Sequence, residues 1–286
     1  MTQKLLLISI FSLILNAIPI SSQVRDLVYL TSTFSVTDSV TQFLKYEVTE
    51  KKSHKMMVKT YYYNNDWKQI DRKIYKQECD SVYLDRSAGE AGNLEGESLY
   101  LPNRIVIKEI EKDLYSFKEY NYVDTLIRKG TCKSYFPLIK HGEVVDYYIN
   151  GNTANKATYD NNVFISAQRW MMDGHKSMNN VYTELADGPK FKNKSIKEFY
   201  TSLFVVLKYD ANDGRKDRLE GTCTIEFIID KEGEMHDIQF IQKSTYSKID
   251  NQIANFLVRQ KGKWSPAKLN NEAVNYVCRI GVSFGT

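Results

Sequence analysis

Short alternating runs of polar and apolar residues fill the first two thirds of the chain. Between residues 24 and 180 these runs are separated by turn-forming residues, as in Met56–Tyr63 and Val144–Ile149. Alternation with a period of two predicts half-buried β-strands, and the turn formers predict hairpins between them. Asn150 and Gly151 follow the second run directly, and this pair favours a hairpin because both residues tolerate positive φ. The pattern therefore predicts a sheet of many antiparallel hairpins.

Some of these segments resemble one another. Asp146–Gly151 and Gln168–Gly174 each place an aromatic strand before a turn, and Lys59–Asn65 is a looser copy. They resemble degenerate MORN-like repeats of about 20 residues, which implies stacked hairpins that each bury a face on the next. We interpret the many tyrosines as cross-strand pairs on a solvated sheet face. The alternative is that they line a ligand groove.

The periodicity changes after Tyr182. Ser195 is placed to cap a helix over 196–207, and Glu198 completes a capping box three residues later. The remaining segments predict strands over 222–230, 235–242 and 274–284 and a helix over 247–259. A hairpin followed by a returning helix makes the final strand antiparallel to the first. The predicted sheet order is second, first, third, with helices covering one face.

The N-terminus carries Lys4, an apolar run over 5–20 and then Ser21, Ser22 and Gln23. The run is shorter than the roughly 20 apolar residues of a membrane span, so residues 1–22 are predicted to be a secretory signal peptide. The alternative is an uncleaved inner-membrane anchor. Both interpretations place the body of the protein outside the cytoplasm, in the periplasm or cell envelope.

Charge and cysteine content narrow the classes of partner. The 39 basic and 35 acidic residues give a net charge of +4, too balanced to indicate a nucleic-acid partner. Cys223 and Cys278 share the phase of apolar neighbours and lie near opposite ends of their predicted strands, so we expect buried free thiols. A disulfide between Cys79 and Cys132 remains an open possibility, because disulfides can form in an exported protein.

The sequence predicts no reaction centre. It lacks a nucleophile elbow, a Walker loop and a zinc-protease helix, and its cysteines and histidines do not have the spacing of a zinc site. The histidines lie in polar, turn-like contexts typical of the surface. We therefore expect no catalytic residues, no metal ligands and no cofactor. An enzyme site built within the first domain is a minor alternative.

The last third of the chain resembles the TonB C-terminal domain of Gram-negative bacteria. The resemblance covers residues 183–286 and depends on the order of several pieces rather than on one motif. The residues that carry it are Gly221, Phe227, Ile229, Asp230, Lys231 and Gly233, then Asp250 on the helix, and Trp264 and Pro266 after it. The upstream segment departs from one exported variety of the family, because Asp210 stands where a proline is expected.

The resemblance implies that this module binds an outer-membrane receptor segment as an added β-strand in TonB-dependent transmembrane transport. The last strand would lie at a sheet edge, with N–H and C=O groups available for pairing. Its solvent-facing residues, and thus the expected partner-binding residues, are Tyr276, Arg279, Gly281 and Ser283. The alternative is that the protein's own N-terminal region covers this edge.

Together these patterns predict an α+β protein of two domains. An N-terminal antiparallel β-rich, repeat-like domain (23–180) precedes a TonB-like β-β-α-β module with a three-stranded antiparallel sheet (183–286). The expected function is non-enzymatic binding of a receptor peptide or another envelope protein. After the leader the chain has only Pro102, Pro137, Pro189 and Pro266, so it lacks the proline-rich stalk of energy transducers. The alternative function is therefore a structural, envelope-associated repeat protein whose C-terminal module mediates assembly.

Overall fold

The computed structural model describes most of the chain from residue 24 onward. The described residues are 24–30, 44–51, 55–63, 67–78, 81–84, 100, 102–183, 185, 187–194, 196–207 and 221–284. The expected leader (1–22), Cys79 and the expected helix cap Ser195 lie outside them. Neither of the two helices that the structure describes has the length and apolar run needed to span a membrane.

Twelve strands form one continuous antiparallel sheet in which every strand pairs with its neighbours in the sequence. The strands are β1 (Val24–Leu30), β2 (Leu44–Lys51), β3 (Lys55–Tyr63), β4 (Trp67–Glu78), β5 (Ser81–Leu84), β6 (Arg104–Glu111), β7 (Leu114–Tyr120), β8 (Leu126–Tyr135), β9 (Leu138–Tyr147), β10 (Thr153–Asp160), β11 (Val163–Trp170) and β12 (Lys176–Asn179). The predicted hairpins are confirmed by this topology. At the predicted Asn-Gly turn, Gly151 has φ of +86° and its N–H donates to the Tyr148 carbonyl at 2.9 Å.

The inner face of this sheet buries aromatic side chains. Ile105, Ile107, Phe117, Cys132 and Val144 form its core. Four tyrosines that were expected on a solvated face pack against this core instead: Tyr75, Tyr115, Tyr135 and Tyr159. Their placement was wrong because alternation separates the two faces of a strand but does not say which face a curved sheet buries.

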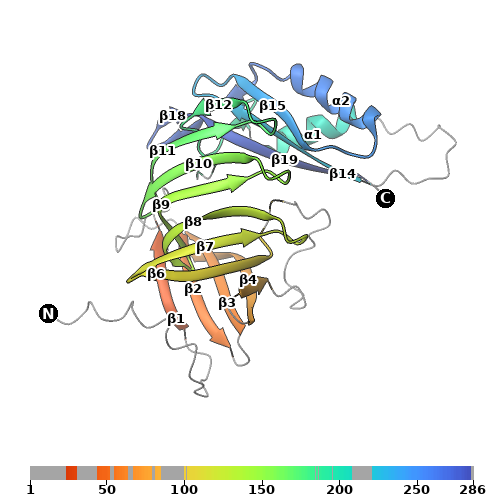
Figure 1. Ribbon diagram of the computed structural model, residues 1–286. Helices are drawn as coiled ribbons and strands as arrows, with labels where there is room; N and C mark the ends of the chain where they lie inside the picture. The colour runs from red at the N-terminus through yellow and green to blue at the C-terminus, as the bar shows by residue number, and fades with distance from the viewer. Residues whose placement is uncertain are drawn as a thin grey trace.

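The remaining strands and both helices form a C-terminal module. Its elements are β13 (Lys190–Phe191), α1 (Ile196–Val206), β14 (Gly221–Ile229), β15 (Met235–Gln242), α2 (Ser247–Val258), β16 (Trp264–Ser265), β17 (Ala267–Leu269), β18 (Glu272–Val274) and β19 (Tyr276–Phe284). Its main sheet has the order β15-β14-β19, so the predicted order of second, first, third is confirmed. Figure 1 shows the module beside the end of the long sheet that carries β10, β11 and β12.

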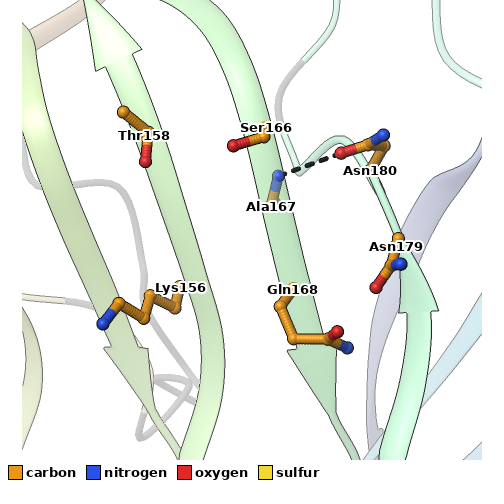
Figure 2. Close-up of a pocket in the computed structure, with 7 residues that line it drawn as sticks. All are labelled: Lys156, Thr158, Ser166, Ala167, Gln168, Asn179 and Asn180. Carbon is orange, nitrogen blue, oxygen red and sulfur yellow. Dashed lines mark hydrogen bonds between the residues drawn. The ribbon is translucent and has the colours of Figure 1, made fainter.

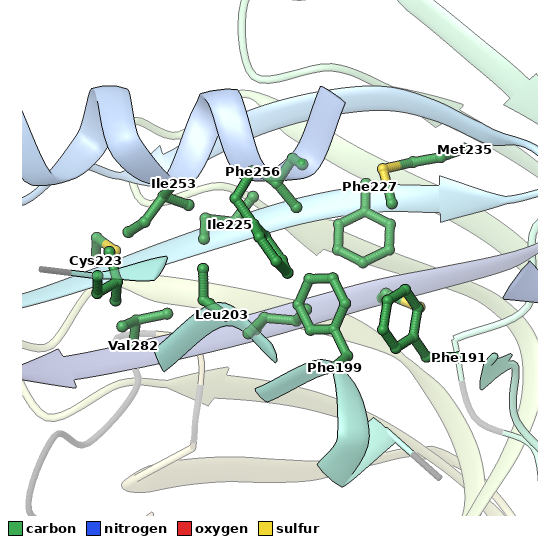
Figure 3. Packing of buried hydrophobic residues seen from close by; sticks show 14 of the residues in the cluster. Phe191, Phe199, Leu203, Cys223, Ile225, Phe227, Met235, Ile253, Phe256 and Val282 are labelled. Carbon is green, nitrogen blue, oxygen red and sulfur yellow. The ribbon is translucent and has the colours of Figure 1, made fainter. Parts of the chain in front are cut away.

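The core of the module lies between its sheet and the two helices. Cys223, Ile225 and Phe227 alternate along β14 and point toward the helices, where they meet Phe199 of α1 and Phe256 of α2 (Figure 3). Phe199 is at the centre of this packing, with ring contacts to five neighbours: Phe191, Tyr200, Phe227, Phe256 and Trp264. The four apolar residues expected on the buried side of the second helix are all buried there: Ile249, Ile253, Phe256 and Leu257.

The described cysteines are free, buried thiols. Cys132, Cys223 and Cys278 form no disulfide. Cys223 lies opposite Val282 and Cys278 opposite Phe227, so the two strands hold these thiols apart, as expected. Burial raises the pKa of Cys132 and of Cys223 to about 12, so neither is a reactive thiolate at neutral pH.

Candidate functional site

Strand β19 has one open side, and we call this side the edge site. It pairs with β14 along its full length, from Gly221 opposite Phe284 to Ile229 opposite Tyr276. Among the described residues, the only backbone that pairs with its other side is Tyr182, which forms a single parallel bridge at the start of the strand. The Tyr182 N–H donates to the Asn275 carbonyl at 2.9 Å, and the Val277 N–H donates to the Tyr182 carbonyl at 3.0 Å.

The direction of one hydrogen bond identifies the groups that this edge presents. Backbone N–H and C=O groups of a strand in an antiparallel pair point alternately toward and away from the partner strand. Since the Val277 N–H points away from β14, those of Arg279, Gly281 and Ser283 point away as well. Tyr182 therefore occupies only the first outward position, and three outward positions follow it. Within the described part of the chain, the alternative, in which an earlier region of the protein covers this edge, amounts to this one backbone contact.

The four expected partner-binding residues lie on two different faces. Arg279, Gly281 and Ser283 share the face that points away from the helices. Tyr276 packs against the module core, on the same face as Cys278 and Ile280. Its expected position on the solvent-facing side was wrong because it is three residues from Arg279, and side chains in a strand alternate with a period of two.

Gly281 leaves open space beside the edge. It is exposed, and a Cβ added to it would meet no atom within 4 Å outside its immediate neighbours. Ser283, two residues further along, is exposed too. Among the described residues, none therefore crowds the sheet face beside the edge at the Gly281 position.

Arg279 belongs to a buried ion cluster that sequence reasoning missed. The cluster consists of Glu226 on β14, Arg279 on β19, Arg169 on β11, Tyr148 after β9 and Gln239 on β15. Arg279 donates to Glu226 Oε2 through Nη2 at 2.7 Å, and Arg169 Nη2 forms an ion pair with Glu226 Oε1. The Tyr148 hydroxyl donates to Oε1 at 2.9 Å, and Gln239 Nε2 donates to the same oxygen at 3.0 Å. All four polar partners thus converge on one carboxylate.

The charges around Glu226 keep it ionised. Burial alone would raise the pKa of this carboxyl, since Glu226 is only 1% exposed. The positive charges of Arg169 and Arg279 and their hydrogen bonds outweigh burial and lower the pKa to about 2. The carboxylate holds the Arg279 guanidinium in place beside the edge, and the ring of Tyr100 lies 4.2 Å from that guanidinium.

The cluster also joins the long sheet to the module. Met172 N–H donates to Gln239 Oε1 at 2.8 Å, and Ser177 Oγ donates to Asp237. Apolar contacts surround these bonds, with Val181 against Ile228 and Val277. The face of β14 that points away from the helices is therefore covered by the long sheet, and β14 is buried on both faces from Cys223 to Ile229. The signal in the sequence was Glu226 itself, a lone acidic residue within an apolar strand.

Comparison with known proteins assigns this module. Residues 212–286 match the family model of the Gram-negative bacterial TonB protein C-terminal. This stretch contains β14, β15, α2 and β19, and hence the edge site. The match begins after α1, which contributes Phe199 and Leu203 to the same core. The resemblance expected from the sequence is confirmed over these residues, and we call residues 212–286 the TonB-like module.

Other comparisons add no functional information. No curated protein matches this chain. A solved structure of a protein with unknown function from Bacteroides fragilis NCTC 9343 aligns over 55% of this chain and 77% of that chain, with 8% sequence identity. Its TM-score of 0.14 is too low to support an argument about either fold or function.

The described residues offer no metal site, because no group of three or more His, Cys, Asp or Glu side chains converges among them. His236 and Asp230 do approach each other, with Nε2 2.7 Å from Oδ2. This pair lies at the turn between β14 and β15, where Asp230 Oδ1 also accepts hydrogen bonds from the N–H groups of Glu232 and Glu234. These hydrogen bonds of Asp230 stabilise the turn between β14 and β15.

Proposed function

We propose that this protein is a non-enzymatic component of the Gram-negative cell envelope that binds an extended segment of a partner protein as an added strand on β19. The partner is an outer-membrane receptor, and the process is TonB-dependent transport. The observation that carries this proposal is the open side of β19, at the edge of a sheet within the residues that match the TonB family. The leader expected over residues 1–22 supports a location in the periplasm or envelope.

The edge site provides both backbone pairing and a means of selection. Three successive outward positions, at Arg279, Gly281 and Ser283, supply main-chain donors and acceptors for an incoming strand. Arg279 is about one-third exposed and is fixed by Glu226, so a partner strand meets a positioned cation at the start of the open stretch. Beside Gly281 there is space for a side chain of the partner. Tyr276 contributes by packing the start of β19 against the module core.

Proline at position 281 tests this proposal. Gly281→Pro removes an outward N–H and keeps the inward pairing with β14, so it blocks an added strand at its centre. We expect the affinity for peptides from the periplasmic N-terminal segments of TonB-dependent receptors to fall at least about 10-fold. Fluorescence anisotropy with labelled peptides measures the change.

Gly281→Ala is the matched control. It keeps the N–H, and its methyl group enters open space, so peptide binding should equal that of the natural chain. If both variants and the natural chain bind every peptide equally well, strand addition on β19 is wrong. If the folded natural chain binds no receptor peptide and instead self-associates in a way that Gly281→Pro abolishes, the edge serves assembly, which is the structural alternative.

A further inference from the structure

A straight row of side chains crosses six strands on the outer face of the long sheet. Its members are directly paired across the strands in the order Lys118 (β7), Lys129 (β8), Val145 (β9), Lys156 (β10), Gln168 (β11) and Asn179 (β12). Direct cross-strand partners point to the same face of a sheet. With neighbouring strands roughly 4.8 Å apart, the row is about 24 Å long. We call these six residues the outer row.

The β7 and β8 end of the outer row is positively charged. Lys118 and Lys129 are both exposed and lie directly opposite each other. Like charges in this arrangement destabilise a sheet, so stability does not explain the pair. Among the described residues neither lysine forms an ion pair. The ammonium of Lys129 lies 5.4 Å from the centre of the Tyr147 ring, and both Tyr147 and Glu143 interact with its charge.

Acidic side chains around the row are already paired. Glu143 lies 2.8 Å from Lys156 Nζ, and the carboxylate of Asp160 lies 3.2 Å from His141 Nδ1. At the end of β7, Asp124 accepts hydrogen bonds from Arg104. Within the described part of the chain, the ammonium groups of Lys118 and Lys129 therefore have no carboxylate at ion-pair distance, and an external anion can pair with them.

The other end of the outer row enters a shallow groove of about 370 Å³. Hydroxyl, amide and ammonium groups line it: Lys156, Thr158, Ser166, Gln168, Asn179 and Asn180, with Ala167 between them (Figure 2). Asn180 is fixed by a hydrogen bond from the Ala167 N–H at 3.1 Å. The groove presents donors and acceptors at short intervals, which suits a ligand rich in hydroxyl groups.

We propose that the outer row and its groove bind an acidic polysaccharide. Lys118 and Lys129 pair with carboxylate groups of the polymer, and the groove side chains hydrogen-bond its hydroxyl groups. A membrane surface fits less well, because Val145 is buried and Val106, which lies directly opposite Lys118 on β6, is only partly exposed. The site is separate from the edge site on β19.

The test uses an oligogalacturonate as the probe, with a maltooligosaccharide of equal length as the neutral comparison. The triple variant Lys118→Gln, Lys129→Gln, Lys156→Gln should bind oligogalacturonate at least about 10-fold more weakly, and added salt should weaken binding to the natural chain. The matched control changes three exposed lysines of the module instead: Lys243→Gln, Lys261→Gln, Lys268→Gln. It carries the same net charge as the triple variant and should bind as the natural chain does. Titration calorimetry measures all of these affinities.

A second pair of variants tests the groove. Thr158→Val and Ser166→Ala remove hydroxyl groups without changing charge, and each should weaken oligogalacturonate binding several-fold if sugar hydroxyls occupy the groove.

Equal binding by the triple variant and its matched control overturns the proposal. So does equal binding of the acidic and neutral oligosaccharides. Binding to phosphatidylglycerol vesicles that the triple variant loses, without binding to oligogalacturonate, also overturns it and identifies a membrane surface. Thermal unfolding checks that the triple variant is folded. It removes one like-charge pair and also the exposed Lys156–Glu143 ion pair, so its midpoint should lie close to that of the natural chain.

Discussion

Glu226→Gln is expected to lower the free energy of unfolding by about 3–5 kcal/mol. The substitution keeps the size of the side chain but removes the negative charge that Arg169 and Arg279 share. Arg169 is almost completely buried, so it would keep its charge away from water after losing its nearest counterion. Chemical denaturation followed by circular dichroism measures the loss.

The same carboxylate predicts how stability depends on pH. The pKa of Glu226 is lowered to about 2 in the folded protein, below its usual value of 4.5. A lowered pKa means that the stabilisation is fully present above pH 4.5 and is lost as the pH falls from there toward 2. The lost contribution is about 3 kcal/mol. Glu226→Gln should therefore be less stable at pH 7 and should lack this part of the acid dependence.

Glu232→Gln is the control for both measurements. Glu232 is exposed, and within the described part of the chain its carboxylate forms an ion pair with the exposed Lys231. Loss of the Glu232 charge should therefore change the free energy of unfolding by less than about 0.5 kcal/mol. A Glu226→Gln variant as stable as this control would mean that the cluster does not join the long sheet to the module in solution.

The local sequence pattern was sufficient to predict the strands and helices of the module. It was not sufficient to predict how the long sheet packs against the module. Apolar spacing over 247–259 and alternation in β14 and β19 specify which side chains meet in the helix-covered core, and this core is as expected. The opposite face of β14 follows the same alternation and carries Thr224 and Glu226, so the pattern alone does not distinguish it from a solvent-facing side. Sequence periodicity cannot show that another sheet covers this face, because that contact joins residues as far apart as Tyr148 and Glu226.

The position of the edge site could be predicted only in part, because it too depends on both local pattern and distant contacts. The order of strands follows from chain topology, and it puts β19 at the edge. The Tyr182 bridge depends on how the long sheet docks, which no local signal encodes. Arg279, Gly281 and Ser283 fall together because of their spacing. Tyr276 breaks that spacing and lies on the helix-covered face.

Gly233→Ala is expected to destabilise the TonB-like module by about 2–5 kcal/mol. Gly233 closes the turn between β14 and β15, with φ of +85° and its N–H donating to the Asp230 carbonyl at 3.0 Å. A Cβ at this position would lie 2.4 Å from the Trp264 carbonyl oxygen. The glycine and tryptophan of the TonB resemblance thus touch in space, although they are far apart in sequence. Thermal and chemical unfolding measure the cost.

Gly174→Ala separates the two causes of this cost. Gly174 has φ of +92°, but a Cβ there would meet nothing within 4 Å outside its immediate neighbours. The control therefore carries only the backbone strain, about 1–2 kcal/mol, and Gly233→Ala carries that strain plus the collision with Trp264. Equal losses in the two variants would show that Trp264 moves away without cost. A larger loss at Gly233 would show that close contact between this turn and the segment after α2 fixes the position of β16. Since Trp264 of β16 contacts the ring of Phe199, the same contact would then support the aromatic core.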